Sequence, residues 1–574
     1  MTKTLREKGI KGLFLVSALF SMAALATITV FLLISGIPFI AHTGVAEFLL
    51  GRRWAILESP PSYGILPMIV ATLYVTALSV ILGTILGLFT SVCLFAFCPK
   101  KLVLPLRQLI NLLAGIPSVI FGLFGMTTIV PLLRDYVSPN GVGYGILAAS
   151  LVLAVMILPT VVSVSLDSLS AVPKSYYEGA LALGATKEEA VFGIVLPAAK
   201  NGITAGIVLA TGRALGETMR GHACDRRQPR NAGQPVPECA YPHRKHRNGR
   251  NGAEGRCIKC AHRLRRRAFR FRTASEHQLL GAQMRKEKGV SHMDKKQHFP
   301  LRRRIFTGMK LISGVMTLLS VAALFAVIIY VFADGTDKLS FDLLFGSYTD
   351  TPSILPAFVG TLELILIAGV IAIPLGIATA VFLAEYTDGE STLVRLIRIA
   401  VETLAAIPSI VYGLFGYLVF VVACGWGYSL LGGGITLAIM ILPVIVRSTE
   451  ESLRSVPVSY REGAYALGAG KARAIFRVVL PAASGGIVTA VILAVGRIIS
   501  ESAVLILTIG MVVNKMPQSI LSPGTSLALD IYYFASYGYP NEAAATSVVL
   551  LAFVLIINLS ASAVGRAIER KAGR

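Results

Sequence analysis

Long apolar runs separated by short polar stretches make up most of this 574-residue chain. A helix that crosses a bilayer needs about 20 predominantly apolar residues. Runs of that length lie near 11–35, 65–97, 107–133, 144–166 and 201–219, and then near 306–333, 354–385, 397–424, 431–449, 484–510 and 542–565. The pattern predicts an all-α polytopic membrane protein with about five spans in its first half and six in its second.

The first run follows a basic N-terminus, MTKTLREKGIKG, which resembles the n-region of a signal peptide. The apolar stretch behind it is too long for a signal peptide and lacks a clear small-residue cleavage site. We therefore expect this segment to be retained as the first membrane span.

The mean hydropathy of +0.70 agrees with a membrane protein, whereas the net charge of +23 would suggest a nucleic-acid partner. The charge is unevenly distributed, because residues 220–304 contain 24 Lys or Arg and only 6 Asp or Glu. The rest of the chain has a net charge of only +5, which is ordinary for a membrane protein with basic cytoplasmic loops. We therefore expect no nucleic-acid partner.

The chain contains an internal repeat. Residues 154–218 align without a gap to 438–502, and AGIPSVIFGLFG (114–125) matches AAIPSIVYGLFG (405–416). Two halves with the same order of spans predict a pseudo-twofold arrangement about the membrane normal, with a pathway between the halves. We place the first half at 1–219 and the second at 293–574.

One polar stretch interrupts the spans of each half, at 168–197 and 452–481. Each is predicted to form two short helices broken at a glycine, Gly184 or Gly468, and to end at Pro197 or Pro481 where the next span begins. The alternative is an ordinary interfacial connector. Small side chains in the first helices would let a partner surface approach; they are Ala180, Ala182 and Ala464.

These stretches resemble the EAA loop of bacterial ABC importer permeases. The matching residues are Glu178, Gly179, Ala180 and Gly184 before IVLP in the first copy, and Glu462, Gly463, Ala464 and Gly468 before VVLP in the second. The resemblance implies two type I importer halves of six spans each. It also implies that each loop is a coupling helix, which docks onto a cytoplasmic ABC ATPase dimer.

Other stretches resemble the phosphate-specific permeases of that family. IPSVIFGLFG and GRALGETM resemble the C-type subunit, whereas IPSIVYGLFG, GRIISESA and SLALDIYYFASYGYPNEAAATSVVLL resemble the A-type subunit. The resemblance implies a multi-pass permease in a bacterial inner membrane that takes phosphate from a periplasmic binding protein. Sulfate or molybdate is the alternative substrate. Membrane lipid is the remaining expected partner, and no cofactor is expected.

Two charge pairs lie within apolar runs: Arg213 with Glu217, and Arg497 with Glu501. A spacing of four places each pair on one face of a helix. Charges at bilayer depth are costly, and the alternative interpretation is a pair that only neutralises itself. Since both pairs follow a coupling loop, we expect both arginines to face the pathway and to offer bidentate donors to a tetrahedral oxyanion.

No GxxxxGK[ST] motif for ATP is present, and no nucleophile–base arrangement stands out. The sequence therefore predicts a transport permease and not an enzyme, with ATP hydrolysis on a separate subunit.

Residues 220–292 differ from the rest of the chain and allow three interpretations. Zinc binding would use Cys257 and Cys260, with Cys224, Cys239, His243 and His262 nearby. The arginine runs could instead bind nucleic acid or anionic lipid. We favour the third interpretation, an out-of-frame translation, with no metal site.

Membrane topology is the reason for this choice. With the N-terminus inside, five spans end outside near Met219, yet the second coupling loop must also face the cytoplasm. A sixth span is therefore required, and 220–305 contains no apolar run that could supply it. Met293 would then begin a separate A-type subunit.

Overall fold

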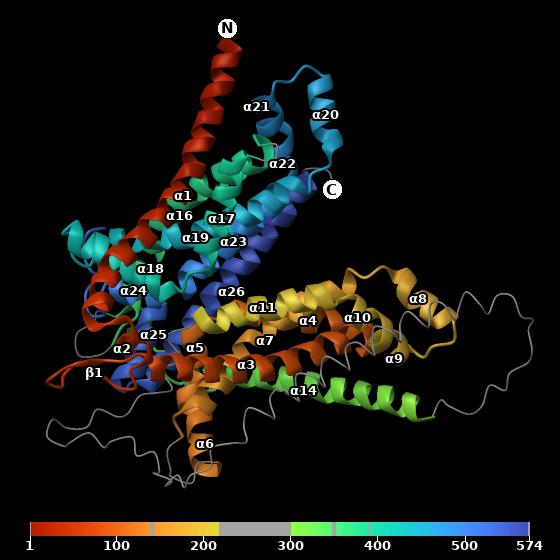
Figure 1. The fold of residues 1–574 in the computed structure, drawn as a ribbon, viewed down its shortest axis with the longest axis horizontal. Coiled ribbons are helices and arrows are strands. Elements are labelled where there is room, and N and C mark those ends of the chain that lie inside the picture. Colours follow the sequence, from red (N-terminus) through yellow and green to blue (C-terminus); the bar gives the residue numbers. More distant parts are fainter. Residues whose placement is uncertain (1, 138–142, 217–299, 347–351, 388–390, 572–574) are drawn as a thin grey trace, which may run out of the picture. The chain divides into compact units, whose positions relative to one another are not determined.

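The computed structural model describes residues 2–137, 143–216, 300–346, 352–387 and 391–571, and almost all of them are helical (Figure 1). Glu217 and segment 220–292, with its cysteines and histidines, lie outside the described residues. The predicted boundaries at 219 and 293 therefore remain predictions.

The first half is a series of helices with one short hairpin. Its elements are α1 (Thr2–Thr43), α2 (Val45–Leu50), β1 (Trp54–Ala55), β2 (Ser62–Tyr63), α3 (Leu66–Val92), η1 (Cys93–Phe97), α4 (Lys100–Ala114), α5 (Ser118–Phe124), η2 (Gly125–Ile129), α6 (Val130–Tyr136), α7 (Ile146–Ser170), α8 (Lys174–Ala182), α9 (Lys187–Ala190), η3 (Val191–Val195), α10 (Leu196–Ala198) and α11 (Lys200–Gly216). The strands pair antiparallel, with Trp54 opposite Tyr63.

The second half repeats the order of the main helices and continues with three helices after α23. Its elements are α14 (Pro300–Thr336), α15 (Phe341–Phe345), α16 (Leu355–Glu385), α17 (Thr392–Ala406), α18 (Ser409–Gly416), η4 (Tyr417–Ala423), α19 (Leu430–Arg454), α20 (Val458–Ala466), α21 (Lys471–Ala474), η5 (Ile475–Val479), α22 (Leu480–Ala482), α23 (Ser484–Ser500), α24 (Ala503–Thr508), α25 (Leu527–Tyr537) and α26 (Pro540–Lys571). The elements written η are π-helical turns, which often mark functional positions in helices.

Among the described residues, eight helices are long and apolar enough to cross a membrane, or up to eleven if each bent helix pair counts as one span. Counted in that way, five lie before residue 217 and six after residue 299. The prediction of an all-α membrane protein with five and six spans is confirmed.

Three apolar runs that were predicted to form single continuous helices are broken in the structure. The run 397–424 is broken into α17 and α18–η4, which are bent by 99°, with Pro408 as the N-cap of α18. The run 107–133 is likewise divided, because α4 ends at Ala114 and Pro117 caps α5. Proline lacks a backbone N–H and restricts the residue before it, so helices break at such positions. The run 484–510 is also divided, since α23 ends at Ser500.

Equivalent glycines let the main helix pairs of both halves approach closely. A Cβ added at Gly87 of α3 would lie 2.7 Å from Val161 of α7, and one at Gly376 of α16 would lie 2.6 Å from Ile445 of α19. No real Cβ fits at such distances. The repeat seen in the sequence is therefore also a repeat in helix packing.

The first helix of each half packs on the other half. In α1, the Phe14 ring lies 5.7 Å from that of Tyr386 and 6.1 Å from that of Phe476. In α14, Phe306 lies 6.4 Å from Phe192. The sequence analysis did not predict this exchange, which completes the core of each half with a helix from the other.

The same exchange includes a buried hydrogen bond. Thr90 of α3 and Ser320 of α14 are linked at 2.9 Å between their hydroxyl oxygens, and both side chains are buried. Two polar groups that satisfy each other in an apolar setting fix the register of one helix against the other. The halves are thus joined by specific contacts as well as by apolar packing.

Candidate functional site

The two predicted coupling helices have the same local structure. Both α8 and α20 follow a proline, and both are followed by a glycine with positive φ, +86° at Gly184 and +78° at Gly468. In the first copy, Gly184 N–H donates to Leu181 O at 2.9 Å and Ala185 N–H to Ala180 O at 3.1 Å. This pair of bonds is a Schellman motif, which ends a helix at a left-handed residue.

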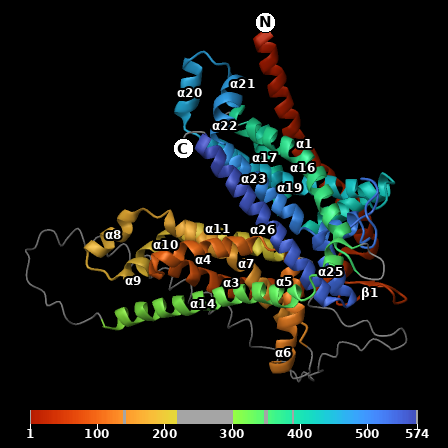
Figure 2. The same ribbon diagram turned by 180° about the vertical axis from the view of Figure 1, so that it is seen from behind.

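The chain then forms a bent helix in each half. The first runs through α9, η3 and α10 and bends by 67° into α11, and the second runs through α21, η5 and α22 and bends by 70° into α23. Figure 1 and Figure 2 show each coupling helix beyond the end of the span that follows it. The predicted Gly turns agree with the structure, but the spans begin a few residues after Pro197 and Pro481.

The coupling helices expose some of the predicted residues and bury others. Both glutamates and both following glycines are exposed, namely Glu178, Gly179, Glu462 and Gly463. Ala464 is half-buried. Ala180 is only 4% exposed, so the expectation that it lets a partner approach is wrong. Other parts of the chain already cover it.

The sequence analysis missed the most exposed apolar side chains of these loops. Leu183 and Leu467, which are equivalent in the repeat, are each 91% exposed. The same exposure at the same position of both copies makes these two leucines accessible to a partner. The identical letters at positions 183 and 467 of the aligned repeat were the available signal.

Replacing Gly184 and Gly468 by valine is expected to uncouple transport from ATP hydrolysis. Nothing lies within 4 Å of a Cβ at either position, so the effect comes from the positive φ and not from lack of space. A left-handed conformation costs a residue with a Cβ roughly 1–2 kcal/mol, and a β-branched residue would distort the turn. The measurement is substrate transported per ATP hydrolysed in proteoliposomes.

Gly425→Val is the matched control for this experiment. Gly425 also has positive φ, +68°, and open space around it. It lies before the first residue of α19, whereas the coupling helix α20 follows the last residue of α19, so Gly425 and α20 are at opposite ends of this span. The same strain at Gly425 should leave the transport ratio unchanged. Normal transport by the Gly184 and Gly468 variants would contradict the role of the turns.

The predicted arginines are half-buried in equivalent helices. Arg213 lies in α11, and its Nη1 donates to Thr160 Oγ1 of α7 at 3.1 Å. Arg497 lies at the equivalent position in α23. Neither arginine is exposed, which agrees with a function inside the protein.

The prediction that Arg497 and Glu501 lie on one face of the same helix is wrong. Helix α23 ends at Ser500, and Glu501 has an extended backbone with φ −85° and ψ 130°. Among the described residues, Arg497 and Glu501 do not form an ion pair with each other. The chain turns at Glu501 because α24 begins two residues later and packs against α18. Glu217 lies outside the described residues, so the predicted pairing of Arg213 with Glu217 stays a prediction.

Both arginine-bearing helices approach the start of α18. A Cβ on Gly216, three residues after Arg213, would lie 4.0 Å from the Cα of Pro408. On the other side, Ile498 belongs to the same core cluster as Tyr412. Tyr412 is buried, and its hydroxyl donates to Leu404 O at 2.6 Å, which holds the break between α17 and α18. The structure thus brings the ends of α11 and α23 to one region.

Known proteins match both halves. Residues 83–221 and 372–574 match the family described as "Binding-protein-dependent transport system inner membrane component". The probable ABC transporter permease protein YqgI of Bacillus subtilis is 33% identical over 291 residues, which cover 47% of this chain and 96% of that protein.

Two further relatives are phosphate transport permeases by name. The PstA homolog of Mycoplasma pneumoniae is 26% identical over 591 residues, covering 89% of this chain and 87% of that protein. PstA of Xylella fastidiosa (strain Temecula1) is 35% identical over 282 residues, covering 46% of this chain and 95% of that protein.

Among solved structures, an inward-facing MetNI methionine transporter matches with a TM-score of 0.32 and 23% identity, covering 38% of this chain and 95% of that one. That similarity is too low to carry a structural argument. The family match, by contrast, covers more than half of the chain and recurs in both halves. The chain therefore belongs to the family of inner membrane components of binding-protein-dependent transport systems, and it is a multi-pass transport permease rather than an enzyme.

Proposed function

We propose that this chain is the permease of an ATP-driven importer of inorganic phosphate. The observation that carries the proposal is the pair of equivalent, half-buried arginines, Arg213 and Arg497, on the spans that follow the two coupling helices. Relatives named as phosphate permeases support the choice of anion.

The chemistry of these arginines suits an oxyanion. A guanidinium presents planar, paired N–H donors that match two oxygens of a tetrahedral anion, and it stays charged at all physiological pH values. A charge at bilayer depth is costly, so charged residues there usually have a function. An apolar or neutral substrate would make no use of two guanidinium groups, whereas a phosphate passing between α11 and α23 would.

We propose that α8 and α20 dock onto a cytoplasmic ABC ATPase dimer. Leu183 and Leu467 would enter apolar grooves of that dimer, and the exposed Glu178 and Glu462 would contact its surface. Since the permease family is defined by binding-protein-dependent transport, a periplasmic phosphate-binding protein would deliver the substrate from the other side.

For residues 220–292 we retain the out-of-frame interpretation as a proposal. The family match stops at 221 and resumes at 372, and the first half contributes only five candidate spans among its described residues. The Mycoplasma relative aligns with both halves of this chain, so a continuous two-half polypeptide is the competing arrangement.

Phosphate uptake by a bacterial strain that lacks its own phosphate permeases tests the function and the frame together. The gene with the frame restored after codon 219 should encode an apolar run of about 20 residues and recover uptake, whereas the printed chain should restore it poorly. Labelled sulfate and molybdate are the control substrates. Uptake of either without phosphate would overturn the anion assignment, and normal transport by the printed chain would overturn the frame interpretation.

A further inference from the structure

One arginine of the second coupling helix, α20, forms a network of hydrogen bonds with its own half. Arg461 of α20 donates from Nη2 to Glu385 Oε1 at 2.6 Å and from Nε to the same oxygen at 3.0 Å. It also donates to the backbone oxygens of Val456 and Leu453, both at 2.8 Å. The side chains of Arg461 and Glu385 are 17% and 4% exposed.

The partners of Arg461 are the ends of two membrane spans. Glu385 is the last residue of α16, and Leu453 lies in the last turn of α19. Partial burial, and then the negative charge of Glu385, raises the pKa of Tyr465 on α20, so the carboxylate acts on more than one residue of this helix. A single side chain thus connects the coupling helix to both spans.

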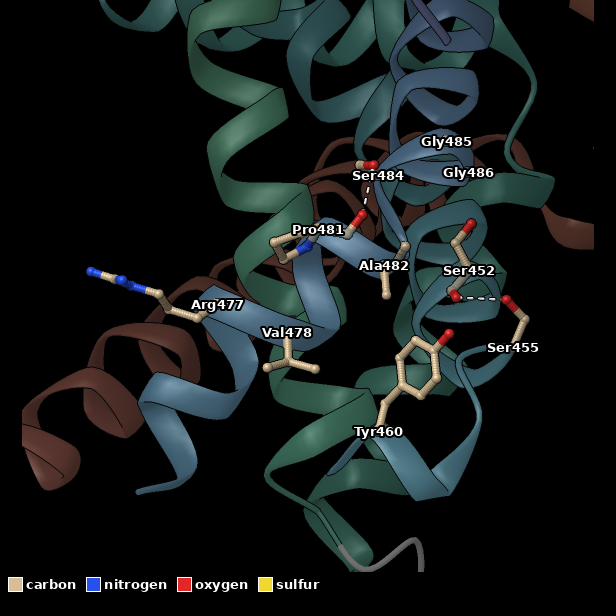
Figure 3. A pocket seen from close by; sticks show the side chains of 11 residues that line it. Ser452, Ser455, Tyr460, Arg477, Val478, Pro481, Ala482, Ser484, Gly485 and Gly486 are labelled. Atoms are coloured by element: carbon tan, nitrogen blue, oxygen red, sulfur yellow. Dashed lines mark hydrogen bonds between the residues drawn. The ribbon is translucent and has the colours of Figure 1, made fainter. Parts of the chain in front are cut away.

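The rest of α20 packs only shallowly against the segments η5 and α21 that follow it. None of its nine residues is buried. A cavity of about 400 Å³ separates it from the bend between α22 and α23, with Tyr460, Ser452 and Ser455 among its lining residues. Figure 3 shows Tyr460 extending from α20 toward these serines, while Arg477 points away from them. The helix therefore has open space beside it into which it could move.

The first coupling helix is attached in a different way. The repeat places Tyr177 at the position of Arg461, and the alignment of Leu66-Pro67 with Leu355-Pro356 places Ala96 at the position of Glu385. Tyr177 packs with an apolar cluster that contains Val92 and Phe192. One coupling helix is thus held by apolar packing and the other by a buried ion pair.

We propose that Arg461 and Glu385 form a strut that transmits movement of the ATPase from α20 to the spans α16 and α19. Both are positioning residues, because neither touches the substrate. The inference rests on the proposed docking of the ATPase onto α20. Without the strut, α20 moves into the neighbouring cavity when the ATPase closes, and ATP is hydrolysed without transport.

The test replaces Arg461 and Glu385 by the residues at the equivalent positions of the first half, Tyr177 and Ala96. Arg461→Tyr and Glu385→Ala are made singly and together in the frame-restored permease, which is reconstituted with its ATPase and binding protein in proteoliposomes. Each single variant leaves a buried charge without its partner, and the double variant removes both charges. Arg454→Tyr is the control, because the side chain of Arg454 is exposed and pairs with Glu450 one turn away on the same helix.

We expect phosphate transported per ATP to fall about tenfold in each single variant, while the ATPase still co-purifies with the permease. The double variant should recover to within about twofold of the unmodified chain, because Tyr and Ala reproduce the first-half pair. The control variant should not change the ratio.

The opposite results have distinct meanings. Normal transport per ATP in both single variants, with the ATPase bound, would overturn the strut alone. A double variant as poor as the single ones would also overturn it, because the loss would then not depend on the unpaired charge. If Leu467→Asp leaves ATPase binding intact, α20 is not the docking site; the proposed docking and this inference then both fail, whereas the assignment of phosphate is tested separately by the uptake experiment.

Discussion

Replacing both Leu183 and Leu467 by aspartate is expected to remove the ATPase from the purified permease. Each leucine is 91% exposed at the end of a coupling helix, and covering such a side chain contributes roughly 1.5–3 kcal/mol. An aspartate in an apolar groove adds the cost of removing a charge from water. We therefore expect binding at least about a hundredfold weaker, measured as the Kd between purified subunits.

Leu57→Asp is the matched control. Leu57 is also fully exposed, but it lies between β1 and β2, far in sequence from either coupling helix. This variant should bind the ATPase normally, and the two single coupling variants should show intermediate affinity. Unchanged binding by the double variant would contradict docking through α8 and α20.

Replacing Arg213 and Arg497 by glutamine is expected to abolish phosphate uptake while the ATPase remains bound. Glutamine keeps much of the side-chain volume but removes the charge and the paired donors. We expect each single variant to lose about a hundredfold in uptake, since a lost charge-assisted contact of 1.5–3 kcal/mol corresponds to roughly one to two orders of magnitude. Lysine should restore little, because it is a point charge without the planar pair of donors.

Uptake measured over a range of phosphate concentrations distinguishes weaker binding from a blocked pathway. Arg134→Gln is the control, because Arg134 is exposed and pairs with its neighbour Asp135 at 2.8 Å. Thr160→Val should have a smaller effect, since it removes only the hydrogen bond that holds Arg213. Full uptake by the double glutamine variant would contradict an anion pathway between α11 and α23.

The sequence by itself determined the features that depend on short stretches of chain. Apolar runs predicted the five and six spans, because a helix satisfies its own backbone and the bilayer selects its length. The glycine turns at Gly184 and Gly468 were predictable for the same reason. Their hydrogen bonds join residues at most five apart, so the local letters decide them. The repeat then predicted that both halves would share these features.

Hydropathy did not show where a run breaks or which face a side chain takes. The turn at Glu501 depends on α24 packing against α18. Ala180 is buried by other segments of the folded chain. A periodic pattern describes one helix and contains no information about its neighbours, so both expectations failed.

Only the tertiary structure decided the contacts between distant residues. Arg461 and Glu385 are 76 positions apart, and Thr90 and Ser320 are 230 apart. The exchange of α1 and α14 between the halves belongs to the same class. Such pairs form when separate helices bury their apolar faces together, and the polar groups that meet there must then satisfy one another. Which groups meet is set by the packing of whole helices, and no local pattern of residues encodes it.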